Sequence, residues 1–107
     1  LERIYLNFPD PWPKERHKKR RLTFRKFLYL YEKILIPRGV LQLKTDNPDF
    51  FEFSLNELIE LKWSIETITR DLHNSIFSED NVMTEYERKF KEEGKKINMC
   101  KAMSPKN

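Results

Sequence analysis

The sequence predicts an α/β fold, in which helices alternate with the strands of a single sheet. Two observations support this prediction. Short runs of β-branched, aliphatic and aromatic residues, such as Val40 to Thr45, have the composition of strands. Between them lie segments such as Phe24 to Leu35, in which apolar residues recur every three or four positions. This alternation is typical of parallel strands joined by right-handed helical crossovers.

Seven elements are expected, in the order strand, helix, strand, helix, strand, short helix, strand. The strands are expected at 3–8, 40–45, 63–70 and 96–103, and the polar segment 71–81 is expected to be a loop. The last two strands can pair antiparallel, as often happens at the edge of a mixed sheet. With 107 residues, the chain forms one domain at most.

The two longer helices have start signals in the sequence. Thr23 is the expected N-cap of a first helix that ends before Pro37. Asn47 and Pro48 are expected to begin a second helix, with the proline at its first helical position. This second helix is expected to run to about Lys62.

A third, short helix is expected over 84–93. Thr84 and Glu87 have the spacing of a capping box, in which each side chain bonds the backbone of the other. Gly94 is expected to end the helix. Capping alone explains why these two residue types stand three positions apart.

A rigid turn follows the first expected strand. Pro9, Pro11 and Pro13 each fix the backbone angle φ and lack an amide N–H. Each also pushes the preceding residue away from helical conformation. Asp10 is therefore expected to be held in place where the strand ends.

A second carboxylate, Asp46, ends the next expected strand. In open parallel sheets, ligands bind outside the carboxyl ends of the strands. Asp10 and Asp46 are therefore expected on the same rim of the sheet, where they indicate a site. The alternative interpretation is a proline-rich turn with a solvated aspartate.

A strongly basic segment follows the turn. From Lys14 to Lys26 there are eight Lys or Arg residues and one acid, Glu15, which gives a local charge of +7 in a chain of net charge +4. Such a cluster releases counterions from a phosphate backbone and so favours nucleic-acid contact. The alternative is a solvated helix start, but cations at a helix N-terminus oppose the helix dipole.

The remaining composition limits the setting of the protein. Cys100 is the only cysteine, which excludes an internal disulfide and fits a reducing compartment. No stretch has the length and apolarity of a transmembrane helix or signal sequence, so a cytoplasmic location without a membrane partner is expected. His73 has no partner at metal-ligand spacing, so no metal site is expected. The chain opens almost directly into a strand, which suggests a start inside a larger fold.

Several separated motifs resemble the bacterial tRNA (guanine-N7-)-methyltransferase family: Asn7 to Lys14, Arg16 to Leu22, Thr45 to Asn47, and Thr84 to Glu87 followed by Lys89, Phe90 and Gly94. They agree with the family in order and spacing over 1–103. The resemblance implies a class I methyltransferase with a Rossmann-like, three-layer α/β/α fold and a seven-stranded sheet. The chain resembles its carboxy-terminal half, so that 1–107 form a single partial domain with strands four to seven, the last of them antiparallel.

The activity implied by this resemblance is methyl transfer from S-adenosylmethionine to guanine N7 in the tRNA variable loop, which forms 7-methylguanine. The family holds this cofactor mainly through a glycine-rich turn and an acidic residue of its amino-terminal half. This chain has only Gly39 and Gly94, in neither context, so the main cofactor-binding half is absent from it. The implied partners are tRNA and that amino-terminal half, and a homodimer is left open.

The resemblance also implies roles for individual residues. Asp10 is implied to be catalytic and to contact the cofactor. The implied substrate-binding residues are Lys14, Asp46, Thr84, Glu85, Tyr86 and Glu87. The implied RNA-binding residues are Arg16, His17, Lys18, Lys19, Arg20 and Arg21.

The chemistry of the target explains why carboxylates are needed. Guanine N7 already has a free lone pair, so its methylation needs no general base but leaves a positive charge on the purine. Nearby carboxylates stabilise that charge as it develops. They also accept hydrogen bonds from guanine N1–H and N2–H₂, and Asp46 and Glu87 are both candidates for this role.

Two alternative functions stay open at this point. One is a non-catalytic, basic RNA-binding fragment. The other is a methyltransferase that acts on DNA bases, because a short proline-containing motif after the fourth strand recurs in enzymes of that broad class. The basic segment and the motif from Thr84 to Glu87 favour tRNA over DNA.

Overall fold

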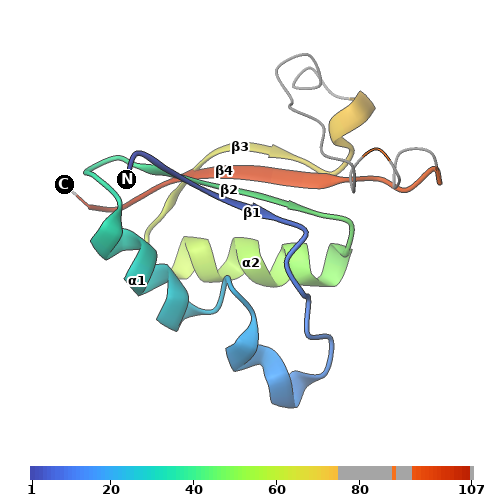
Figure 1. Cartoon of the computed structure of the whole chain (residues 1–107), viewed down its shortest axis with the longest axis horizontal. Coiled ribbons are helices and arrows are strands. Elements are labelled where there is room, and N and C mark those ends of the chain that lie inside the picture. The colour runs from blue at the N-terminus through green and yellow to red at the C-terminus, as the bar shows by residue number, and fades with distance from the viewer. Residues whose placement is uncertain (75–87, 89–92, 107) are drawn as a thin grey trace.

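The described chain forms one mixed four-stranded sheet. The structure is a computed structural model that describes residues 1–74, 88 and 93–106. The strands are β1 (Arg3–Asn7), β2 (Val40–Thr45), β3 (Ser64–Thr69) and β4 (Asn98–Met103), in the spatial order β1-β2-β4-β3. β1 runs parallel to β2, whereas β4 is antiparallel to both β2 and β3 (Figure 1). The predicted α/β class and the predicted antiparallel last strand are confirmed.

Two α-helices cover the same face of this sheet. α1 (Arg25–Ile34) connects β1 to β2, and α2 (Pro48–Glu60) connects β2 to β3 (Figure 1). The buried core lies between them and the sheet and consists of Leu28, Leu35, Leu41, Leu43, Phe50, Phe51, Leu55, Leu58, Trp63, Cys100 and Ala102. The described residues thus form two of the three layers expected. None of the described helices combines the length and the apolar character needed to cross a membrane.

The start of α2 agrees with the sequence prediction. Asn47 is the N-cap, and its side-chain oxygen accepts a hydrogen bond from the amide N–H of Phe50 at 2.9 Å. Pro48 occupies the first helical position, where a missing N–H costs nothing. This local sequence signal therefore fixes where the helix begins, at the end of β2.

The start of α1 differs from the prediction. Thr23 is not the N-cap, because the N-cap position belongs to Phe24, which has no side-chain cap. Thr23 is instead fully buried, and its hydroxyl shares a hydrogen bond of 2.7 Å with the Ser54 hydroxyl on α2. The amide N–H of Arg25 is bonded by a Glu57 carboxylate oxygen at 2.8 Å, so a residue from the neighbouring helix replaces the expected local cap.

Each of the two helices carries one isoleucine that lies outside the core. Ile34 on α1 is 53% exposed and Ile59 on α2 is 59% exposed. Helical spacing alone could not show this, because it fixes a face of the helix but not how far the sheet extends beneath it.

Cys100 is buried on β4, and burial raises the pKa of its thiol to about 12. The thiol is therefore a neutral part of the core.

Two segments outside the sheet form 3-10 helices that the sequence did not predict. The basic segment contains η1 (Glu15–Arg20), and the expected loop begins with η2 (Leu72–Asn74). Lys18, Lys19 and Arg20 lie in the last turn of η1, where a helix dipole favours positive charge. The predicted dipole cost applies instead to Arg25 and Lys26, which begin α1 without an acid in its first turn. The rest of that loop and the short helix predicted over 84–93, apart from positions 88 and 93, lie outside the described residues.

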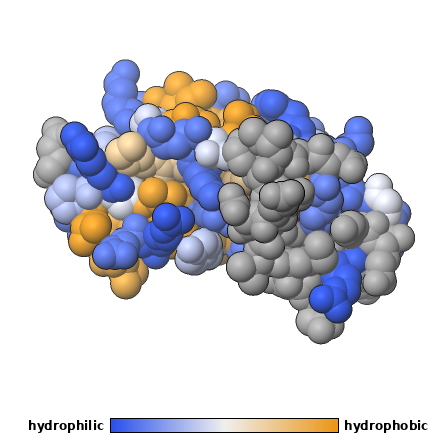
Figure 2. Space-filling model, turned by 90° about the horizontal axis from the view of Figure 1, so that it is seen from above, coloured by the Kyte–Doolittle hydropathy of each residue, from blue (hydrophilic) through white to orange (hydrophobic). Residues whose placement is uncertain are grey.

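The face of the sheet opposite the two helices has a polar middle row, whereas Met99 on the same face joins Leu72, Ile97 and Phe8 in a second apolar cluster. Tyr5, Gln42, Lys101 and Thr67 are register partners across the four strands and point away from the core residues Leu41 and Leu43, as strand alternation requires. Figure 2 looks onto this side, where blue hydrophilic residues lie among orange hydrophobic patches outside the grey region. β1 and β3 are the two edge strands of the described sheet.

Candidate active-site rim and nucleic-acid interface

The carboxyl ends of β1 and β2 form one rim. Asn7 and Lys44 are register partners, and the amide N–H of Phe8 donates to the carbonyl of Lys44 at 2.8 Å. Asp10 and Asp46 follow these two strand ends, so the structure brings both predicted carboxylates to the same rim. Asp10 is exposed, whereas Asp46 is half-buried.

The turn that carries Asp10 has an unusual backbone. Phe8 and Trp12 have φ of 53° and 42°, a left-handed conformation that bulky side chains rarely adopt. Each such residue costs about 1–3 kcal/mol and persists only where its surroundings fix it. One carboxylate oxygen of Asp10, Oδ1, accepts the amide N–H of Trp12 at 2.9 Å. The carboxylate is thus part of the turn, and its orientation depends on the turn's geometry.

Arg21 connects this turn to the body of the protein. Its Nε donates to the carbonyls of Pro11 and Trp12, and its Nη2 donates to the Trp12 carbonyl, each at 3.1 Å. The guanidinium also lies over the Phe53 ring of α2, 4.5 Å from the ring centre. Arg21 is only 8% exposed. Sequence reasoning missed this role, because nothing local separates Arg21 from the five cations before it.

The cations that precede Arg21 are solvated. This basic surface consists of Lys14, Arg16, Lys18, Lys19 and Arg20, all exposed. Lys18 forms an exposed ion pair with Glu15 at 3.3 Å, and the Arg20 guanidinium lies 5.0 Å from the centre of the Trp12 ring. His17 is half-buried and meets the same ring edge-on at 5.4 Å between ring centres. The basic surface therefore adjoins the Asp10 turn through Trp12.

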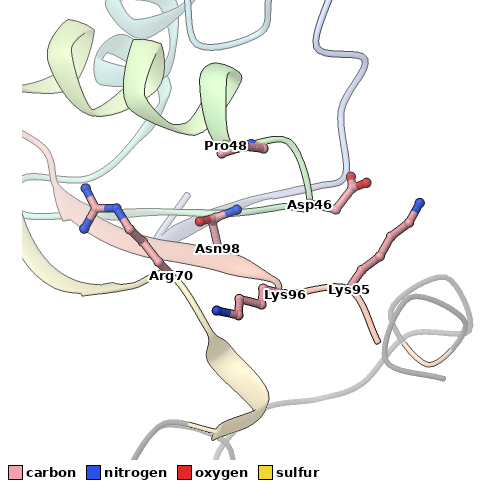
Figure 3. Close-up of a pocket in the computed structure, with 6 residues that line it drawn as sticks. All are labelled: Asp46, Pro48, Arg70, Lys95, Lys96 and Asn98. Carbon is pink, nitrogen blue, oxygen red and sulfur yellow. The ribbon is translucent and has the colours of Figure 1, made fainter. Parts of the chain in front are cut away.

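A pocket of about 490 Å³ opens beside Asp46. Its lining residues are Asp46, Pro48, Arg70, Lys95, Lys96 and Asn98 (Figure 3). Asn98 links β4 to β2 at the pocket, because its side-chain N–H donates to the Thr45 carbonyl at 3.1 Å. In Figure 3, the side chains of the neighbours Lys95 and Lys96 point in opposite directions, Lys95 on the side of Asp46 and Lys96 on the side of Arg70.

The charges around this pocket are mixed. Arg70 pairs with Glu52 at 2.7 Å, and Lys95 pairs with Glu93 at 3.7 Å. Sequence reasoning did not single out Arg70, Lys95 or Lys96, although two adjacent lysines before the last strand were a visible signal. Thr84, Glu85, Tyr86 and Glu87 lie outside the described residues. No group of three or more His, Cys, Asp or Glu side chains in the described part of the chain could hold a metal ion.

These features define a class of protein. A mixed sheet with two helices on one face, two carboxylates on the rim of its parallel strands and an adjoining basic surface is consistent with part of a class I methyltransferase fold. Residues 1–100 match the family described as "Putative methyltransferase". The chain therefore belongs to this methyltransferase family, and the resemblance noted in its motifs is confirmed.

Curated relatives carry a more specific name. A protein from Geobacillus sp. (strain WCH70) is 54% identical over 98% of this chain, and one from Mycoplasma mobile is 54% identical over 92%. A third, from Lachnoclostridium phytofermentans, is 47% identical over 99%. Each is named tRNA (guanine-N(7)-)-methyltransferase. The matched regions are 47%, 49% and 50% of these relatives, so the chain spans about half their length.

Proposed function

We propose that this chain is the carboxy-terminal half of a tRNA methyltransferase that forms 7-methylguanine in the tRNA variable loop. The relatives' names and the motifs support this function. The structural observation that carries it is the exposed Asp10, held in a strained turn at the end of β1 and directly beside the basic surface. The chain then corresponds to strands four to seven of a larger domain.

The role of Asp10 follows from the charge that the reaction creates. Methylation of N7 makes the purine cationic, so a fixed carboxylate beside it is more useful in the transition state than in the ground state. One oxygen of Asp10 is held by Trp12, whereas its other oxygen makes no hydrogen bond within the described residues. That second oxygen is the one we assign to the reacting centre.

Recognition of the guanine is assigned to the pocket beside Asp46. Its volume of about 490 Å³ falls within the range of small-molecule sites, roughly 300–1,000 Å³. In this proposal Asp46, which follows the end of β2, accepts hydrogen bonds from guanine N1–H and N2–H₂. Glu87 stays an equal candidate for this edge. Lys14 and the segment from Thr84 to Glu87 complete the proposed substrate contacts.

Binding of tRNA is assigned to the basic surface. Its five exposed cations and His17 lie on and beside η1, where they can neutralise backbone phosphates. The contact is sequence-independent, so specificity must come from the guanine pocket. A basic RNA-binding fragment without catalytic activity is the alternative that this surface would equally support.

S-adenosylmethionine is the cofactor we propose, and when bound it supplies the methyl group. The described residues offer only part of its site. Gly39 packs against Leu35, where a Cβ atom would approach to 2.9 Å, and Gly94 has φ of +75° with open space around it. Neither glycine forms a cradle for a cofactor, so in this proposal Asp10 closes a site built mainly by the amino-terminal half.

The wider setting is also a proposal. The buried free thiol of Cys100 fits a reducing compartment, which supports a cytoplasmic location. The amino-terminal half is proposed to pair with β1, because β1 is an edge strand of the described sheet and would follow directly on that half in the chain. A homodimer stays a prediction.

Methyl transfer by the full-length natural protein tests this function. The protein is mixed with labelled S-adenosylmethionine and unmodified tRNA, and the digested RNA is examined for 7-methylguanine. Asp10→Asn should lower the rate by about 10²–10³-fold, because the neutral amide cannot offset the developing charge. Affinity for tRNA should stay unchanged, since the basic surface supplies it.

Glu66→Gln is the matched control, since Glu66 is an exposed carboxylate on β3, away from the rim. It should retain wild-type turnover. Near-wild-type turnover of Asp10→Asn would remove Asp10 from catalysis. Binding of tRNA without any label in 7-methylguanine would favour the non-catalytic alternative.

A further inference from the structure

We propose that Arg21 is a positioning residue that holds the Asp10 turn against α2, in place of the RNA contact that its motif implies. The proposal rests on the proposed function for its catalytic consequence, but its structural part is independent. Arg21 joins three parts of the molecule: the carbonyls of the turn, the basic segment that contains it, and the Phe53 ring on α2.

The composition of the turn creates the need for such a residue. Pro9, Pro11 and Pro13 have no amide N–H, so the turn can form few hydrogen bonds within its own backbone. Its carbonyls still need donors. The Arg21 guanidinium supplies three N–H···O contacts to Pro11 and Trp12, all at 3.1 Å. A planar fork of donors can serve two successive carbonyls in this way.

Phe53 fixes the position of that fork. The Arg21 guanidinium lies 4.5 Å from the centre of the Phe53 ring, on a helix whose neighbouring residues are in the core. Stacking on an aromatic face suits a guanidinium better than an ammonium group. α2 packs directly on the sheet (Figure 1), so the contacts of Arg21 fix Trp12 relative to the sheet. The amide N–H of Trp12 in turn donates to the Asp10 carboxylate.

The same contacts argue against a phosphate ligand. At 8% exposure, Arg21 presents little surface to RNA, and Nε and one terminal nitrogen are already engaged. Turning outward would leave the carbonyls of Pro11 and Trp12 without these donors. Its immediate neighbour Arg20 is exposed, and the Arg20 guanidinium lies over the Trp12 ring. The two adjacent arginines therefore have different roles in this proposal: Arg20 contacts RNA, and Arg21 positions the turn.

Arg21→Lys in the full-length natural protein tests this division. Lysine keeps the charge but cannot reproduce the fork or the stacking. We expect kcat for methyl transfer to fall on the order of 10²-fold, as a displaced catalytic group predicts. The affinity for tRNA and its dependence on salt should stay at wild-type values.

Lys19→Gln is the matched comparison, because Lys19 is exposed and belongs to the basic surface. It should raise KM for tRNA and flatten the plot of log K against log salt by up to about 0.9. If Arg21→Gln flattens this plot as much as Lys19→Gln, Arg21 is an RNA ligand and the proposal is wrong.

Fluorine NMR gives a readout that does not depend on activity. The protein is labelled with 5-fluorotryptophan, and the Trp12 resonance is assigned with Trp12→Phe. Arg21→Lys should shift or broaden the Trp12 signal and leave the signal of core Trp63 unchanged, whereas general unfolding would move both. An unchanged Trp12 signal would overturn the proposal even if the protein proved to have no methyltransferase activity.

Phe53→Leu provides a second variant in case Arg21→Lys fails to fold. It keeps Arg21 but removes the ring beneath it, so the Trp12 signal should move in the same direction by a smaller amount. A Trp12 signal identical to wild type in Phe53→Leu would show that α2 does not hold the turn.

Discussion

The basic segment divides into two regions that look alike in the sequence and differ in the structure. Lys14 to Arg20 lie on and beside η1 with their charges in solvent, and they contain no buried residue. Arg21 to Arg25 are attached to α2: Arg21 through Phe53, Thr23 through Ser54, and Arg25 through Glu57. A single run of cations can therefore contain both a surface for binding and the residues that hold this surface against the rest of the fold.

The first region should dominate RNA affinity. Neutralising Lys18, Lys19 and Arg20 together should flatten the plot of log K against log salt by up to about 0.9 per lost contact for duplex RNA. The measurement is a tRNA titration at several salt concentrations. Neutralising Lys26, Lys33 and Lys62, which are also exposed but lie outside the basic surface, should change the slope far less. An unchanged slope in the first variant would place the RNA contact elsewhere.

The second region should dominate stability. Glu57→Ala removes the carboxylate that accepts the amide N–H of Arg25 at 2.8 Å and so leaves the first turn of α1 uncapped. Loss of a cap costs about 1–2 kcal/mol, which should lower the urea midpoint of unfolding. A hydrogen bond with Glu57 and the charge of Glu57 also raise the pKa of Arg25.

Glu60→Gln separates the contribution of the cap from that of the ion pair. Glu60 also pairs with Arg25, at 2.7 Å, but its side chain is exposed and it caps nothing. Exposed ion pairs contribute little, so the urea midpoint should hardly change. Equal losses in the Glu57 and Glu60 variants would show that the ion pair, and not the cap, holds the start of α1.

A smaller loss than that of Glu57→Ala is expected at Thr23. Thr23→Val keeps the shape of the side chain but removes the hydroxyl bonded to Ser54 at 2.7 Å. The net loss should be about 1 kcal/mol in the free energy of unfolding, since Ser54 still donates to the Phe50 carbonyl at 2.8 Å. Combining Thr23→Val with Ser54→Ala should cost less than the sum of the two single losses, because they share one bond.

The fold could be predicted largely from local patterns. Short β-rich runs located all four described strands, and Asn47 with Pro48 located the start of α2, because each signal acts within a few residues. The insertion of β4 between β2 and β3 was not predicted. Register between strands distant in the sequence depends on which faces must be buried, and the sequence pattern alone does not rank the alternatives.

The candidate site could be predicted only in part. The motifs pointed to Asp10 and Asp46, and strand order explains why both lie on one rim. The pocket lined by Arg70, Lys95 and Lys96 could not be predicted, because these residues meet only when β3 and β4 pair beside β2. What each residue contributes to catalysis stays a prediction until the variants are measured.

The α/β class, the family, the rim carboxylates and the concentration of charge could all be predicted from the amino-acid sequence, because these follow from local periodicity, strand ends and motif order. Which charges face water depends on the folded chain. Arg20 and Arg21 are chemically identical neighbours, yet the turn carbonyls and Phe53 bury one and leave the other solvated. Burial depends on segments brought together from distant parts of the chain, so no local pattern could have distinguished these two arginines.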